Sequence, residues 1–103
     1  MITLKVCSPD IEQLEKVALF LLERKLALDI NIIKDITRIN KVDGKIVSST
    51  VTELNAKTKA LLFQEIDELI KSNFKPIPEI YSSPIIHMDW EQTKQLSKKI
   101  INI

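Results

Sequence analysis

Hydrophobic and polar positions alternate over residues 2–7 (ITLKVC), a pattern typical of a strand. A Ser-Pro-Asp break follows, in which Ser8 or Asp10 can cap a helix and Pro9 suits its entry. Apolar residues then recur at helical spacing; they are Ile11, Leu14, Val17, Ala18, Leu21 and Leu22. A single amphipathic helix of this length is marginal in water, so we expect its apolar side to pack on a sheet.

The middle of the chain predicts one long hairpin, with strands over residues 28–42 and 45–58. The first strand is rich in Ile and Val, with an imperfect alternation around Asp35. The second is rich in Ser and Thr, as a strand with one face in water would be. Asp43 and Gly44 lie between them and indicate a type I′ turn, because that turn needs a positive φ at both central residues.

The remaining residues predict a second helix, a fourth strand and a third helix. The second helix, over about residues 59–72, has an apolar stripe and is ended by the prolines that follow; the stripe is Leu62, Ile66, Leu69 and Ile70. Residues 79–81 and 84–86 predict a strand with an irregular middle. Residues 90–103 predict a short amphipathic helix, with Thr93, Leu96, Ile100 and Ile103 on one side.

This order of elements predicts an α+β fold of the ferredoxin-like, split βαβ kind. It has a four-stranded antiparallel sheet with two helices on one face, plus a C-terminal helix. The length of 103 residues fits one domain, which we expect to span residues 1–103. The uncovered sheet face would need the last helix or a neighbouring subunit over it.

Composition and charge exclude several classes of protein. The net charge of +1 argues against a nucleic-acid partner, which usually meets a basic stripe. One cysteine excludes an intrachain disulfide and fits the reducing cytoplasm. No apolar run suits a signal peptide or a membrane span, so we expect a cytoplasmic protein with no membrane partner. Gly44 is the only glycine, which excludes a glycine-rich phosphate loop.

An ordered set of short segments resembles the CutA divalent-cation tolerance family along nearly the whole chain. The segments are SPD at 8–10, KLA at 25–27, INI at 30–32, IT at 36–37, DGKI at 43–46, KT at 57–58, PEI at 78–80, PI at 84–85 and DW at 89–90. The resemblance implies a homotrimer of ferredoxin-like subunits whose long hairpins pair across subunits. It also implies a role in tolerance of copper and other divalent metals, with no catalytic activity established for the family.

The sequence departs from the family pattern at several chemical positions. Asp29 stands where the family usually has a cysteine, and Val51 where it has a glutamate. Asn40 and Val42 replace a Tyr and a Trp before the hairpin glycine. Residues 73–76 (NFKP) replace a His-Pro-Tyr-Glu run, and the segment between residues 84 and 90 is shorter. The residues that form the scaffold therefore match the family pattern better than the residues that would carry its metal chemistry.

His87 and Asp89 are the candidate metal ligands, for a divalent ion such as Cu or Zn. An imidazole and a carboxylate two residues apart on an extended segment can point to one side and hold a metal weakly. Copies from three subunits can also converge on a trimer axis. The competing interpretation is a surface loop, where the family has an aromatic residue at the place of His87.

Lys57 and Glu79 are the candidate ligand residues of a cleft between subunits, since the resemblance places the family's lysine and glutamate there. A buried or interfacial pair of this kind can fix subunit geometry or hold an anion. The competing interpretation is a solvated pair, which would contribute at most about 1 kcal/mol to the stability of the fold.

Other reactive residue types have structural interpretations that we favour. Cys7 is best read as a small buried hydrophobe, and Trp90 as a core or trimer-interface residue. Lys94, Lys98 and Lys99 fit the solvated face of the last helix. With one His, one Cys and no convergent carboxylates by spacing, we predict no enzyme activity.

Three functions stay open from the sequence. The first is a CutA-like trimer implicated in divalent-metal tolerance, acting by binding. The second is a PII-like trimeric sensor that binds a small anionic metabolite or nucleotide between subunits. The third is a structural trimer whose polar hairpin face binds another protein.

Overall fold

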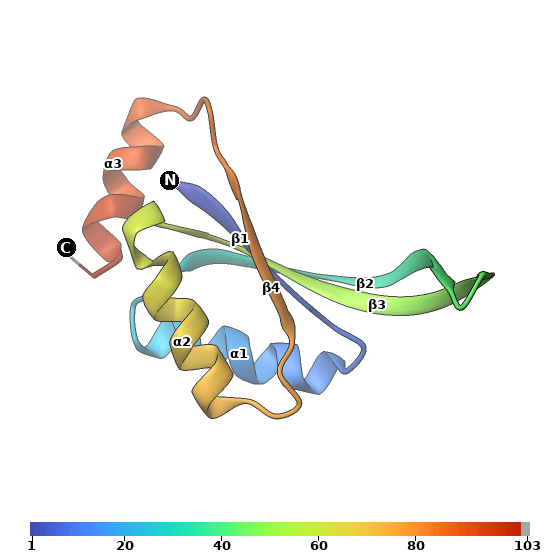
Figure 1. Ribbon diagram of the computed structural model, residues 1–103. Helices are drawn as coiled ribbons and strands as arrows, with labels where there is room; N and C mark the ends of the chain where they lie inside the picture. The colour runs from blue at the N-terminus through green and yellow to red at the C-terminus, as the bar shows by residue number, and fades with distance from the viewer. Residues whose placement is uncertain (102–103) are drawn as a thin grey trace.

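The computed structural model describes residues 1–101. The described elements are β1 (Ile2–Ser8), α1 (Ile11–Glu23), β2 (Leu28–Val42), β3 (Lys45–Thr58), the 3₁₀ turn η1 (Ala60–Leu62), α2 (Phe63–Asn73), β4 (Glu79–Pro84) and α3 (Trp90–Lys99). The strands form one antiparallel sheet in the order β2-β3-β1-β4 (Figure 1). The predicted ferredoxin-like α+β fold is confirmed.

α1 and α2 cover one face of the sheet, and the core lies between them and the central strands (Figure 1). Leu4 and Val6 of β1 are fully buried, together with Leu14 and Val17 of α1 and Ile66 of α2. Side chains alternate along a strand. Lys5 and Cys7 of β1 therefore point to the face that these helices leave open. α3 adds Ile100, which follows it, to the same core.

The entry to α1 is fixed by Asp10 and Ser8 in different ways. The Asp10 carboxylate accepts from the backbone N–H of Glu12 at 3.0 Å and is the N-cap. The Ser8 hydroxyl instead donates to Oε1 of Gln13 at 2.7 Å. Gln13 in turn donates to the backbone carbonyl of Pro76 at 2.5 Å, which ties the start of α1 to the loop before β4.

Two bulges in β2 explain its imperfect alternation. The pairing of β2 with β3 shifts between Leu28 and Asn31 and again between Ile33 and Ile36. Asp29 and Asp35 lie at these shifts, with φ of 51° and 59°. Aspartate visits the left-handed region more readily than most residues, so each can accommodate a β-bulge.

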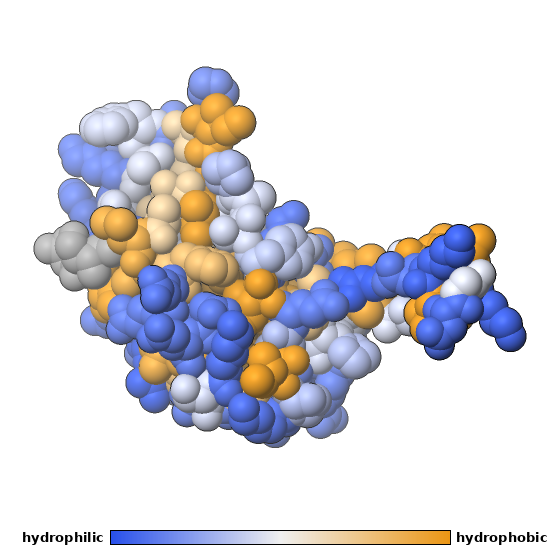
Figure 2. Space-filling model, viewed as in Figure 1, coloured by the Kyte–Doolittle hydropathy of each residue, from blue (hydrophilic) through white to orange (hydrophobic). Residues whose placement is uncertain are grey.

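The hairpin turn falls where the sequence predicts it. Asp43 and Gly44 have φ of 50° and 79°, as a type I′ turn requires. The ends of the two strands that flank the turn, residues 36–42 and 45–50, leave the body of the molecule as a projecting arm (Figure 1). The arm carries exposed apolar side chains on both of its strands (Figure 2); they are Ile39, Val42, Ile46 and Val47.

Three predicted boundaries are wrong. The helix expected over 59–72 begins with the 3₁₀ turn η1, and α2 itself starts at Phe63. β4 is continuous from Glu79 to Pro84, because Ser82 and Ser83 pair with β1 through the backbone, and it ends before Ile85. α3 ends at Lys99, since Ile100 is extended, and Ile103 lies outside the described residues.

Across residues 1–101, no helix combines the length and the hydrophobicity needed to cross a membrane.

Candidate functional site

Polar side chains of three neighbouring strands lie together on the open face of the sheet. Cys7 of β1 is directly opposite Glu53 of β3 on one side and Glu79 of β4 on the other. Lys5, two residues earlier, is opposite Tyr81 of β4 in the same way. Residues directly opposite in an antiparallel pair share a face. The register therefore gathers polar side chains around Cys7.

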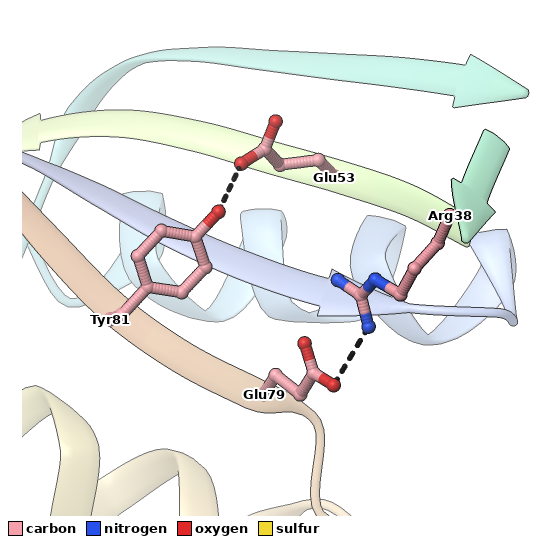
Figure 3. Close-up of polar contacts among 4 residues, drawn as sticks. All are labelled: Arg38, Glu53, Glu79 and Tyr81. Carbon is pink, nitrogen blue, oxygen red and sulfur yellow. Dashed lines mark hydrogen bonds and ion pairs between the residues drawn. The ribbon is translucent and has the colours of Figure 1, made fainter. Parts of the chain in front are cut away.

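Figure 3 shows two contacts among the polar residues of this face. The Tyr81 hydroxyl donates to Oε1 of Glu53 at 2.9 Å, above β1. Nη1 of Arg38, at the base of the projecting arm, donates to Oε1 of Glu79 at 2.8 Å. The exposed fraction of Cys7 is only 4%. We call Cys7 and the four residues of these two contacts the Cys7 cluster.

Two groups of the Cys7 cluster, the Cys7 thiol and the Tyr81 hydroxyl, have raised pKa values. Burial raises the pKa of the Cys7 thiol, and the Glu53 carboxylate acts in the same direction, whereas the Tyr81 hydroxyl opposes them. The hydrogen bond to Glu53, followed by burial, raises the pKa of Tyr81 to about 12. A protonated thiol is a weak nucleophile and a poor metal ligand. The arrangement is thus suited to holding strands together rather than to nucleophilic chemistry.

Lys57 and Glu79 are not brought together within the chain. Lys57 is opposite Thr3, and Glu79 is opposite Cys7, so about 13 Å of β1 separates them. Nζ of Lys57 instead pairs with Oδ2 of Asp29 at 3.3 Å. An intrachain Lys57–Glu79 pair is excluded, while a contact between copies of the chain stays a prediction.

A small polar hollow of about 320 Å³ lies beside Lys57 on the same sheet face. Lys5, Asp29 and Asn55 also line it. Oδ1 of Asn55 is buried there without a hydrogen-bond partner, which is costly unless a bound molecule supplies one. The hollow gives a ligand room beside Lys57 on this face of the sheet.

His87 and Asp89 lie in the exposed segment between β4 and α3. Asp89 is the N-cap of α3, and its Oδ2 accepts from the backbone N–H of Gln92 at 3.1 Å. No group of three or more His, Cys, Asp or Glu side chains able to hold a metal occurs within residues 1–101. The two residues therefore offer at most part of a coordination shell from one chain.

Trp90 is 74% exposed, so it is not part of the core of the chain, and its alternative place in a trimer interface stays a prediction. The roles of Arg38, Glu53 and Tyr81 are absent from the sequence predictions. The available signal was the alternation of polar residues in three strands, at positions 3, 5 and 7, then 53, 55 and 57, then 79, 81 and 83. Combined with the strand register, this alternation indicates one polar face of the sheet.

Sequence and fold comparisons agree with this architecture. The family profile of CutA1 divalent ion tolerance protein matches residues 2–98. No curated protein matches the chain significantly in sequence.

Solved structures of CutA proteins share the fold along nearly their whole length. A variant of CutA1 from Pyrococcus horikoshii is 25% identical, with 99% of this chain and 100% of that chain covered and a TM-score of 0.85. The divalent cation tolerance protein Cut A1 from Thermus thermophilus is 26% identical, over 97% and 99%, with a TM-score of 0.81. The periplasmic divalent cation tolerance protein CutA from Archaeoglobus fulgidus is 27% identical, over 96% and 98%, with a TM-score of 0.80. The chain therefore belongs to the CutA1 divalent ion tolerance family.

Proposed function

We propose that the protein takes part in the tolerance of divalent metal ions such as copper, as a cytoplasmic homotrimer that acts by binding rather than catalysis. The match of the family profile over residues 2–98 carries this proposal. The raised pKa values of the Cys7 thiol and the Tyr81 hydroxyl support the part that concerns catalysis, because neither group is an activated nucleophile.

The projecting arm supports the homotrimer. Ile39 and Ile46 lie on one face of the arm and are 66% and 79% exposed. Side chains of this size at the end of a hairpin have nothing of their own chain to pack against (Figure 2). Exposed apolar patches of this kind are typical of interfaces, and a second and third copy of the chain would cover them.

Light scattering of a double variant tests the assembly. Ile39→Asp with Ile46→Asp places two charges on the apolar face of the arm, and we expect the mass to fall from that of a trimer to that of a monomer. The matched control is Leu19→Asp with Leu61→Asp, which changes two other exposed apolar side chains, and it should remain trimeric. A wild-type monomer at micromolar concentration would contradict the proposal.

His87 and Asp89 are the proposed metal ligands, with the remaining ligands supplied by other copies of the chain. Both side chains are exposed, and only one oxygen of Asp89 is engaged in capping α3. An imidazole and a carboxylate suit Cu²⁺ and Zn²⁺.

Calorimetric titration of Cu²⁺ and Zn²⁺ into chelator-stripped protein tests this site. Binding should be lost in His87→Ala and weakened in Asp89→Asn, which removes the charge but keeps the N-cap. Glu91→Gln, a nearby exposed carboxylate change, should bind as the wild type does. Binding that is unchanged in His87→Ala would exclude His87 as a ligand.

A PII-like role in binding a small anion at Lys57 and Glu79 is the second candidate. The hollow beside Lys57 favours it, because the Lys57 ammonium group can pair with the anion there. The unsatisfied Oδ1 of Asn55 would accept a hydrogen bond from a hydroxyl or amino group of the same metabolite. The existing Lys57–Asp29 pair at 3.3 Å counts against it, because an anion would have to compete with Asp29. An anion that raises the melting temperature of the wild type but not of Lys57→Ala would support this role.

A further inference from the structure

Five lysines from three separate segments line one groove beside α3. The groove has a volume of about 1060 Å³, and its walls carry Lys25, Lys59, Lys94, Lys98, Lys99 and Trp90. None of its lining residues within the described chain is acidic. We call it the lysine groove. The net charge of the chain is only +1, so the groove is a local concentration of charge and not a reflection of a basic protein.

One wall of the lysine groove is a single face of α3. Trp90, Lys94 and Lys98 follow one another at intervals of four residues, which places them on the same side of a helix. Like charges at this spacing repel each other. The repulsion is relieved when an anion binds between them.

The opposite wall, which carries Lys25 and Lys59, is held in place by contacts with Ile101, a residue that follows α3. The backbone carbonyl of Lys25 accepts from the N–H of Ile101 at 2.9 Å. Nζ of Lys59 donates to the carbonyl of Ile101 at 2.8 Å. Lys25 itself has a φ of 56° in the turn that ends α1. The first contact fixes the backbone at Lys25, and the second holds the ammonium group of Lys59 in place, so this wall is formed before any ligand arrives.

The charges of the groove have no acidic counterpart within residues 1–101. Ion pairs are found for Lys57, Lys71 and Arg38, each outside the groove, and for none of the five groove lysines. Trp90 adds a largely exposed indole to the same wall. Ammonium groups without an acidic partner in residues 1–101, next to an open aromatic face, suit a ligand that has both negative charge and a flat ring.

We propose that the lysine groove binds a phosphate ester that carries an aromatic ring, such as a nucleoside triphosphate. The phosphates interact with Lys94 and Lys98, since lysine is a common point-charge partner of phosphate. The ring stacks on Trp90. The volume of the groove matches that of small-molecule sites, which are about 300–1,000 Å³. None of His87, Lys57 and Glu79 lines the groove, and the proposal does not depend on the metal-binding role.

Calorimetric titration of sodium ATP into the metal-free protein, in low salt with EDTA, tests the charge. We expect the affinity to fall about tenfold or more in Lys94→Glu with Lys98→Glu. The matched control is Lys16→Glu with Lys75→Glu, which makes the same change in net charge at exposed lysines outside the groove. The control should keep its affinity within about twofold of the wild type. An equal loss of ATP affinity in the two double variants would mean that net charge alone determines binding, and it would overturn the proposal.

Inorganic tripolyphosphate, which has no ring, tests the role of Trp90. We expect ATP to bind about tenfold more tightly than tripolyphosphate, as stacking on an aromatic side chain predicts. Trp90→Leu should remove that difference. Because Trp90 is the only tryptophan, its fluorescence also reports occupancy of the groove directly. No binding of ATP at low salt, or equal affinity for both compounds, would overturn the proposal. Neither result bears on the titration of metals into the wild type and His87→Ala, so failure of this proposal is distinguishable from failure of the metal-binding proposal.

Discussion

The hydroxyl of Tyr81 donates a 2.9 Å hydrogen bond to Oε1 of Glu53, and so joins β4 to β3 across the strand that separates them. The bond passes over β1 (Figure 3), the strand in which Cys7 is directly opposite Glu53. It connects two strands that share no backbone hydrogen bonds. A side-chain contact of this kind fixes the open face of the sheet, which α1 and α2 do not cover.

We predict that Tyr81 titrates with a midpoint near pH 12, against an ordinary value of 10.0. The hydrogen bond to Glu53 favours the protonated phenol, so its stabilising effect is full below about pH 10 and is lost as the pH rises through 12. The near-ultraviolet absorbance of the only tyrosine measures this midpoint directly. Glu53→Ala should move it towards 10, whereas Glu79→Gln, a carboxylate that does not contact the hydroxyl, should leave it unchanged.

The Cys7 thiol should react slowly in the folded protein. It is nearly inaccessible, and its pKa is raised chiefly by burial, so little thiolate is present at neutral pH. We expect modification by an aromatic disulfide at pH 8 to be about 100-fold slower than in guanidinium chloride, because the native protein must first open locally. Arg38→Ala should raise the native rate by opening one side of the cover, and Lys98→Ala should not. A native rate equal to the unfolded rate would contradict the burial of Cys7.

Local patterns predict much of the fold because they act through the backbone. The hairpin bounds follow from Asp43 and Gly44, whose preference for positive φ determines where the chain reverses. β4 is assigned less well, since Ser82 and Ser83 look like a break. Their backbone groups nevertheless pair with β1, and strand pairing does not require apolar side chains at an edge.

The candidate sites are less predictable because they depend on distant parts of the chain. Arg38 and Glu79 are 41 residues apart and meet only through the path of the arm past the end of β1. In the same way, Lys94 and Lys98 look like the solvated face of a helix until Lys25 and Lys59 are placed opposite them. Spacing along the sequence reports neighbours on one element, and it does not report contacts between elements.

Gly44→Val should lower the melting temperature through the backbone alone. Gly44 has a φ of 79°, and a Cβ built there has nothing within 4 Å, so no steric contact with other residues is expected. The left-handed conformation costs a β-branched residue about 1–2 kcal/mol. Gly44→Asn is the matched control, since asparagine tolerates this conformation, and it should be nearly neutral. Equal melting temperatures of the two variants, measured by calorimetry, would contradict the turn assignment.

Thr58→Val should destabilise the protein although it keeps the shape of the side chain. Thr58 is fully buried at the end of β3, and its hydroxyl donates to the carbonyl of Leu26 at 2.6 Å. Valine fills the same space but leaves that carbonyl without its side-chain donor, at a cost of about 1–3 kcal/mol. The matched control is Ser97→Ala on the exposed side of α3, which also removes a hydroxyl in contact with solvent and should change the urea midpoint little. A similar midpoint for both variants would mean that water reaches the Leu26 carbonyl, and that the contact between the end of β3 and the turn after α1 contributes nothing to stability.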